Sequence, residues 1–271
     1  MTKTFLLYCS IIFLNINALA QVPPGAVLQS SFLEDINGDG QIEVLAFGDS
    51  ITRGVGDFNP FGSLVDEEDA SSVPFGEAGF PLRLETFLGI GISNQGLPGE
   101  LINGDGIGRF ARVISSERPD YAIILTGSND AFTGTRSGQI FFSYQALVNI
   151  ARANGVEPIL ITPTPTCCDR ASLNPFLTTY AAEARSVGDI NGISIVDANR
   201  AFRNGCPALG SCPLLNRPEG LHPNQGGYDV IGEVILATLL NIDIFSGSGA
   251  SDLASRLGLP EESVLTQPDA Q

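Results

Sequence analysis

Histidine is almost absent from this chain, because a single one, His222, occurs in 271 residues. Imidazole is the side chain whose ordinary pKa lies closest to neutral pH, so any proton transfer through an imidazole must use this residue. His222 lies in the segment 218–224, far downstream of an apolar run that ends in Gly48, Asp49 and Ser50. His222 is therefore the one candidate for a histidine base.

Basic residues are also scarce, with 14 Lys and Arg against 30 Asp and Glu and a net charge of -16. A surface of this charge repels the phosphates of nucleic acids and of anionic lipids. We therefore expect no nucleic acid partner. A length of 271 residues suits one α/β domain with decorations rather than two equal halves. The sequence leaves the oligomeric state open.

Long apolar runs are lacking too, and the apolar stretch at 5–14 is short for crossing a bilayer. It follows Lys3 and precedes the small residues at 18–20, which is the layout of a secretory signal peptide. We expect residues 1–20 to be removed on export and the mature chain to begin at Gln21. The predicted location is secreted or periplasmic, without a stable membrane anchor.

Cysteine is infrequent, and of the five residues one, Cys9, lies within the expected signal peptide. The remaining four suggest up to two disulfides in an oxidising compartment. Adjacent cysteines could bond each other only through a strained ring, so we expect two bridges from the 167/168 pair to the other two, with the individual partners left open. A zinc site is not expected, because the spacing lacks two C-x-x-C hooks. The four candidates are Cys167, Cys168, Cys206 and Cys212.

Short apolar segments alternate along the chain with longer mixed ones, which is typical of a three-layer sandwich of helices around a parallel sheet. The expected strands are 44–47, 90–93, 121–125, 158–161 and 193–196. The expected helices are 79–88, 108–116, 139–153, 173–187 and 225–240, with a short one at 251–257. In such sheets the ligand site lies at the carboxyl ends of the strands. Residues 57–75 have no clear period and predict an exposed insertion.

Ser50 directly follows the first expected strand. A serine hydroxyl is a weak nucleophile, so it needs a base to take its proton and donors to hold the oxyanion formed on attack. Asp49 is expected to brace the turn rather than to react. The segments 94–99 and 127–130 follow two further strands and offer glycine N–H groups and the amide of Asn129.

Four blocks in this order resemble the SGNH, or GDSL-type, hydrolase superfamily of serine esterases and lipases. They are Phe47 to Thr52, Asn94-x-Gly96-x-x-Gly99, Gly127-x-Asn129-Asp130 and Glu219-x-x-His222-Pro223, and the resemblance covers roughly residues 44–241. The resemblance implies a flavodoxin-like α/β/α sandwich with five parallel strands. It also implies Ser50 as nucleophile, His222 as base, and an oxyanion hole made of the N–H groups of Ser50 and Gly99 and the Asn129 amide.

The chain departs from the family pattern at Glu219, where the pattern has aspartate. Glutamate is one methylene longer but can still accept the Nδ1–H of histidine and stabilise the imidazolium. We expect a Ser50-His222-Glu219 triad. The alternatives are a dyad, with Glu219 in solvent and a backbone carbonyl orienting the ring, and a weakened or inactive relative.

The activity implied is hydrolysis of carboxylic esters through an acyl-enzyme on Ser50, without a cofactor for catalysis. The expected substrates are small molecules or polysaccharides bearing short acyl or acetyl esters, and a lipase or lysophospholipase-type acyl hydrolase is the alternative. The expected division is an extension at 21–43, a hydrolase domain at 44–244 and a tail of unassigned role at 245–271.

The extension contains a loop that resembles the DxNxDG loops of EF-hand-like and dockerin-like calcium modules. Oxygen side chains occupy positions one, three and five, and glycine position six, but Ala46 occupies position twelve, where a bidentate glutamate is usual. A structural calcium ion and a metal-free Asx turn both fit this pattern. A non-catalytic, calcium-dependent binding module on the same fold is therefore the rival function. The candidate ligands are Asp35, Asn37, Asp39, Gln41 and Glu43.

Overall fold

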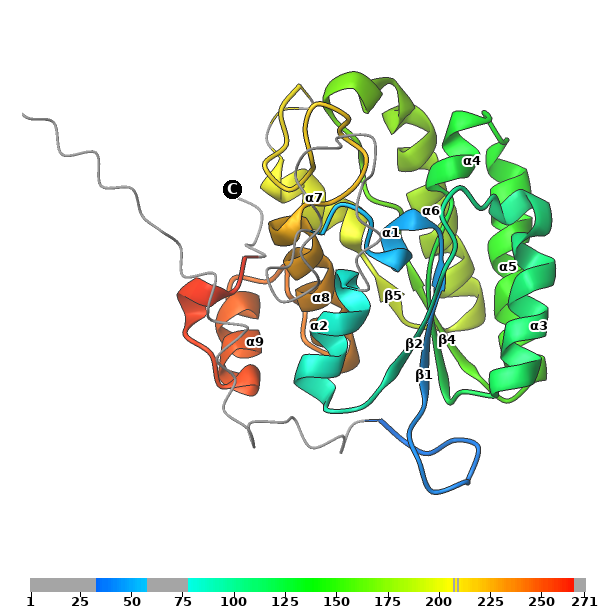
Figure 1. Ribbon diagram of the computed structural model, residues 1–271. Coiled ribbons are helices and arrows are strands. Elements are labelled where there is room, and N and C mark those ends of the chain that lie inside the picture. Colours follow the sequence, from blue (N-terminus) through cyan, green and yellow to red (C-terminus); the bar gives the residue numbers. More distant parts are fainter. Residues whose placement is uncertain (1–32, 58–77, 207, 209, 266–271) are drawn as a thin grey trace, which may run out of the picture.

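A five-stranded parallel sheet in the order β2-β1-β3-β4-β5 forms the centre of the molecule (Figure 1). The computed structural model describes residues 33–57, 78–206, 208 and 210–265. The strands are β1 (Val44–Gly48), β2 (Ile92–Gly96), β3 (Tyr121–Leu125), β4 (Glu157–Ile161) and β5 (Ile195–Val196). The expected parallel sandwich with five strands is confirmed.

Helices cover both faces of the sheet (Figure 1). On one face lie α2 (Gly79–Leu88), α7 (Ala198–Gly205), α8 (Gln225–Leu239) and α9 (Gly249–Leu257). On the other lie α3 (Ile107–Glu117), α5 (Ser137–Ala153) and α6 (Asn174–Asn191). Short helices come after strands: α1 (Ser50–Arg53), the π-helix η2 (Ile102–Gly106), α4 (Ser128–Phe132) and the 3₁₀ helix η3 (Cys168–Leu173). A further 3₁₀ helix, η4 (Glu261–Ser263), follows α9.

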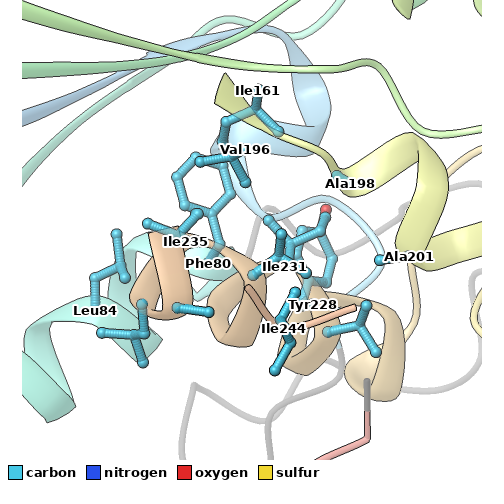
Figure 2. Close-up of a cluster of buried hydrophobic side chains, with 14 of the residues drawn as sticks. Phe80, Leu84, Ile161, Val196, Ala198, Ala201, Tyr228, Ile231, Ile235 and Ile244 are labelled. Atoms are coloured by element: carbon cyan, nitrogen blue, oxygen red, sulfur yellow. The ribbon is translucent and has the colours of Figure 1, made fainter. Parts of the chain in front are cut away.

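The two faces of the sheet bury two separate hydrophobic cores, as the side-chain alternation of a strand requires. Val44 and Ala46 of β1 belong to the core under α2 and α8, whereas Leu45 and Phe47 belong to the core under α3 and α5. Figure 2 shows the first core, where side chains of α2 and α8 pack against Ile161 and Val196 at the ends of β4 and β5. Because every β1 side chain is buried, the strand reads as a continuous apolar run.

The segment after residue 244 packs onto the first core. Leu253 and Leu257 of α9 are buried in it, together with Val264. The main-chain N–H of Leu265 donates to both carboxylate oxygens of the buried Glu233 of α8, at 2.8 and 3.0 Å. The expected tail therefore contributes buried surface to the same domain. Three segments lie outside the described residues: the expected signal peptide, residues 21–32, and the expected insertion apart from its first residue, Asp57.

The loop before β1 lies at the amino ends of the strands, opposite α1 (Figure 1). Asp35 Oδ1 accepts the N–H groups of Gly38 and Asp39 at 2.6 and 3.2 Å, and its Oδ2 accepts that of Gly40 at 2.8 Å. Asn37 Oδ1 accepts the N–H of Asp39 at 2.9 Å. These contacts order the loop as an Asx turn, and calcium binding stays a prediction.

The expected disulfide pairing is wrong. Cys206 is bonded to Cys212, and the Cα atoms of the two residues are 4.6 Å apart, while Cys167 and Cys168 are free. The intervening segment turns back on itself through a bridge between Ala208 and Ser211, which brings its two ends together. A short-range turn therefore decides the pairing.

Candidate active site

The turn after β1 places Ser50 at the carboxyl edge of the sheet. Asp49 caps α1, because its Oδ1 accepts the N–H of Ile51 at 2.9 Å. Gly48 is required by close packing, since a Cβ there would lie 1.8 Å from the carbonyl oxygen of Leu125. Burial raises the pKa of Asp49 to about 6, although the N–H of Ile51 and the charge of His222 oppose the rise. Asp49 thus braces the turn, as expected, and is fully buried.

The loop carrying His222 is fastened to the segment after α1 by Asn216, which the sequence reasoning missed. The Asn216 N–H donates to the carbonyl of His222 at 2.9 Å, and its side-chain amide donates to the carbonyls of Gly56 and Pro223, both at 2.9 Å. No local pattern in the sequence could reveal a contact across 160 residues. On the other side of the loop, the N–H of Cys167 donates to the carbonyl of Gly220 at 2.8 Å.

Ser50, His222 and Glu219 form a continuous chain of hydrogen bonds. The Ser50 Oγ to His222 Nε2 distance is 2.9 Å, and the His222 Nδ1 to Glu219 Oε1 distance is 3.1 Å. Glu219 Oε1 also accepts the main-chain N–H of His222 at 2.7 Å. A carboxylate can only accept, so Nδ1 carries the ring proton and Nε2 is free to accept the serine proton.

Glu219 is 36% exposed at its side chain but is held against the ring. Burial raises the pKa of its carboxyl. The hydrogen bonds from the His222 ring and main chain, together with the charge of His222, lower this pKa by a larger amount. The net pKa is below the ordinary value of 4.5. The carboxylate is therefore ionised at neutral pH and can stabilise a positively charged imidazole.

The expected oxyanion donors come from three neighbouring strands of the sheet. Ser50 follows β1, Gly99 follows β2, and Asn129 lies on α4 after β3. Gly99 has a φ of +80°, a backbone conformation that glycine adopts readily. Within the part of the chain that the structure describes, its N–H donates to no acceptor. The Asn129 amide donates one hydrogen to the carbonyl of Glu100 at 3.1 Å, which leaves its second hydrogen available.

Asp130, the last residue of the block at 127–130, connects the loop after β2 to α4. Its carboxylate accepts the N–H groups of Ile102 and Asn103 at 2.9 and 3.0 Å. Burial raises its pKa, against the effect of these same N–H groups. Asp130 thus positions the segment that carries Gly99 relative to Asn129.

Among the described residues there is no group of three or more His, Cys, Asp and Glu side chains that could hold a metal ion. Within the same residues, every helix is too short or too polar to cross a membrane.

A serine, a histidine and a carboxylate in hydrogen-bond sequence at the carboxyl edge of a parallel sheet define the class of serine hydrolases with an α/β/α sandwich. The model of the GDSL-like lipase/acylhydrolase family matches residues 46–230. The chain belongs to this family, as the four blocks predict, and is a carboxylic ester hydrolase. No curated protein matches it.

Solved structures of similar fold include a protein of the G-D-S-L family, an acetylxylan esterase and a lipase/acylhydrolase. A lipolytic protein of the G-D-S-L family from Veillonella parvula has a TM-score of 0.58 and 18% identity, covering 74% of this chain and 100% of its own. An acetylxylan esterase from Geobacillus stearothermophilus, in a catalytic variant, has a TM-score of 0.57 and 19% identity, with 73% and 94% covered. A lipase/acylhydrolase from Enterococcus faecalis has a TM-score of 0.54 and 23% identity, with 72% and 93% covered. At these identities the likeness concerns the fold.

Proposed function

We propose that the protein is a secreted serine esterase that removes short acyl or acetyl groups, including those on polysaccharides, through an acyl-enzyme on Ser50. The observation that carries this proposal is the hydrogen-bond chain from Glu219 through His222 to Ser50 Oγ. It supplies a base at hydrogen-bond distance from the nucleophile and an orienting group on the far side of the base.

In the proposed reaction His222 Nε2 takes the proton of Ser50 as Oγ attacks the ester carbonyl. The oxyanion of the tetrahedral intermediate accepts from the N–H groups of Ser50 and Gly99 and from the Asn129 amide. His222 then protonates the leaving alcohol. A water molecule, deprotonated by the same ring, releases the acid and restores Ser50. Glu219 stabilises the imidazolium in both halves, and the cycle needs no cofactor.

Three features support a secreted enzyme acting on short esters. The first is the signal-peptide pattern of residues 1–20, and the second is the Cys206–Cys212 disulfide, which suits an oxidising compartment. The third is the acetylxylan esterase among the proteins of similar fold, whose substrate class we extend to this chain as part of the proposal.

Acyl hydrolysis of lipids is the second candidate, favoured by exposed apolar side chains near the expected oxyanion donors. Leu97 lies two residues before Gly99 and is 47% exposed, and Phe132 lies three residues after Asn129 and is 42% exposed. Both follow carboxyl ends of strands, and they could contact a long acyl chain.

The test combines a panel of p-nitrophenyl esters, from acetyl to long-chain, with acetylated xylan. We expect the highest kcat/KM for the shortest acyl groups and release of acetate from the glycan. Activity confined to long chains would contradict the short-ester proposal in favour of the lipase. A fluorophosphonate should label Ser50, and an unlabelled but folded protein would favour the non-catalytic binding module.

A further inference from the structure

Arg109 of α3 contacts two of the segments that carry the expected oxyanion donors. Its Nη2 donates to the carbonyl of Gly48, the last residue of β1, at 3.2 Å. Its Nε and Nη2 donate to the two carboxylate oxygens of Glu100 at 2.5 and 2.6 Å. Gly48 is two residues before Ser50, and Glu100 directly follows Gly99. One guanidinium thus joins the nucleophile turn to the loop after β2.

Glu100 extends this connection to the third segment. Its carbonyl accepts a hydrogen of the Asn129 side-chain amide at 3.1 Å. A carbonyl can face only the NH₂ end of an amide, so this contact fixes which way the Asn129 side chain is turned. The position of the Glu100 main chain therefore decides both where the Gly99 N–H lies and how Asn129 presents its remaining hydrogen.

The contact requires an arginine. The Glu100 side chain is only 4% exposed, so its carboxylate needs a charged partner. A guanidinium reaches both carboxylate oxygens and a carbonyl at once, which the single ammonium of lysine cannot do in the same plane. The guanidinium also lies over the ring of the buried Phe47, 4.1 Å from the ring centre. Three groups, the Glu100 carboxylate, the Gly48 carbonyl and the Phe47 ring, thus hold the Arg109 side chain in one place.

We infer that Arg109 is a positioning residue that assembles the oxyanion hole through Glu100, an inference that rests on the proposed esterase function. The oxyanion exists only in the transition state and the tetrahedral intermediate, so displacement of its donors raises the barrier without weakening substrate binding. Arg109 therefore acts on kcat.

The experiment compares Arg109→Gln and Arg109→Lys with the wild-type enzyme on p-nitrophenyl acetate. We expect kcat to fall by about 10- to 100-fold, less than for outright loss of an oxyanion donor, with KM changed less than about threefold. A phenylboronic acid forms a tetrahedral anionic adduct with a serine. Its affinity should fall by a factor similar to that in kcat/KM, whereas a purely structural defect would move KM and the folded fraction instead.

Arg112→Gln is the matched control, because Arg112 is exposed on the same helix and the substitution removes the same charge. We expect it to leave kcat unchanged. Glu100→Gln keeps the main-chain carbonyl and should cost only a few-fold in kcat. Adding Glu100→Gln to Arg109→Gln removes the unpaired buried carboxylate, so the double variant should recover part of the lost kcat.

The outcomes separate this inference from the proposed function. A wild-type protein without esterase activity on any ester overturns both. An active wild type whose Arg109→Gln variant keeps its kcat overturns the positioning role alone. The same holds if Arg112→Gln lowers kcat as much as Arg109→Gln does, or if the folded variants lose affinity for substrate rather than turnover.

Discussion

Two fully buried aspartates lie at opposite ends of the sheet and are treated differently by their surroundings. Asp120, just before β3, accepts the N–H groups of Ile36, Asn37 and Glu43 at 2.7, 2.9 and 2.8 Å. Asp49, just after β1, accepts one N–H through Oδ1. Its Oδ2 is buried and has no hydrogen-bond partner among the described residues. The two carboxylates are therefore equally buried, but only that of Asp120 has hydrogen-bond donors for both of its oxygens.

This difference in hydrogen bonding distinguishes the amino edge of the sheet, where Asp120 stabilises the fold, from the carboxyl edge, where the candidate active site lies. At the amino edge, the Asp120 carboxylate holds the loop before β1 against the sheet, and both of its oxygens accept hydrogen bonds from main-chain N–H groups. At the carboxyl edge, burial raises the pKa of Asp49 to about 6, and the buried hydroxyls of Thr126 and Ser128 have no partner in the described part of the chain. Buried polar groups without a hydrogen-bond partner lower the stability of the folded state, and the three named here lie at the carboxyl edge, on the same side of the sheet as Ser50.

The largest expected effect comes from removing the catalytic base at the carboxyl edge of the sheet. His222→Ala leaves Ser50 without the only imidazole in the sequence, so kcat should fall by roughly 10⁴- to 10⁶-fold. The melting temperature should change little, because the side chain is partly exposed. Steady-state kinetics and thermal unfolding measure the two quantities. Ser50→Ala is the control, and adding it to His222→Ala should cause no further loss, since the two residues act as one unit.

Glu219→Gln tests the departure from the family pattern and should have a smaller effect. The amide can still contact the His222 ring, but it cannot stabilise the imidazolium, so we expect kcat to fall by roughly 10²- to 10⁴-fold. Glu219→Asp should retain more activity because it keeps the charge. Unchanged turnover in Glu219→Gln would remove Glu219 from the triad and favour a dyad.

The matched pair Asp49→Asn and Asp120→Asn tests the comparison through stability. The folded-state pKa of Asp49 is raised from 3.8 to about 6, so ionisation of this buried group disfavours the folded state as pH rises through that window. The shift is worth roughly 3 kcal/mol at pH 8, which Asp49→Asn should recover in part, with the gain vanishing near pH 4. Asparagine keeps an oxygen that can cap α1.

Asp120→Asn should behave in the opposite way. Its amide nitrogen would face an N–H that the carboxylate now accepts, and we expect a loss of about 2 to 3 kcal/mol at pH 7 with kcat unchanged. Urea unfolding at several pH values measures both variants. Equal destabilisation by the two substitutions would contradict the distinction between the edges.

The strands could be predicted from the sequence where burial on both faces of the sheet makes them apolar, as in β1, β3 and residues 158–161 of β4. The edge strand β2 was placed two residues early at its start, because its register is set by pairing with β1, and Asn94, Gln95 and Gly96 carry no hydrophobic signal. The helices α1 and α4 are four and five residues long, too short for a period to show.

The sequence predicts which residues form the candidate site, but not the residues that hold them in position. Ser50, Glu219 and His222 stand in recognisable blocks, and the structure brings them into contact, while their roles stay predictions. Asn216 and Arg109 could not be found in this way, since each contacts main-chain atoms far away in the sequence. Such contacts depend on how loops meet at the edge of the sheet, which local pattern does not encode.

The smallest expected effect concerns the loop at 35–43, where a structural calcium ion is our remaining prediction. The loop lies at the amino edge, opposite α1, which begins at Ser50 (Figure 1), so calcium should raise stability and leave kcat unchanged. With a dissociation constant near 1 mM, 10 mM calcium would add about 1.4 kcal/mol, visible as a small rise in melting temperature that EDTA reverses. Magnesium is the matched control ion, and Asp39→Ala, which removes the oxygen ligand at position five, should abolish the rise. An equal rise with magnesium, or none with calcium, would favour the metal-free Asx turn, in which Asp35 and Asn37 accept main-chain N–H groups without an ion.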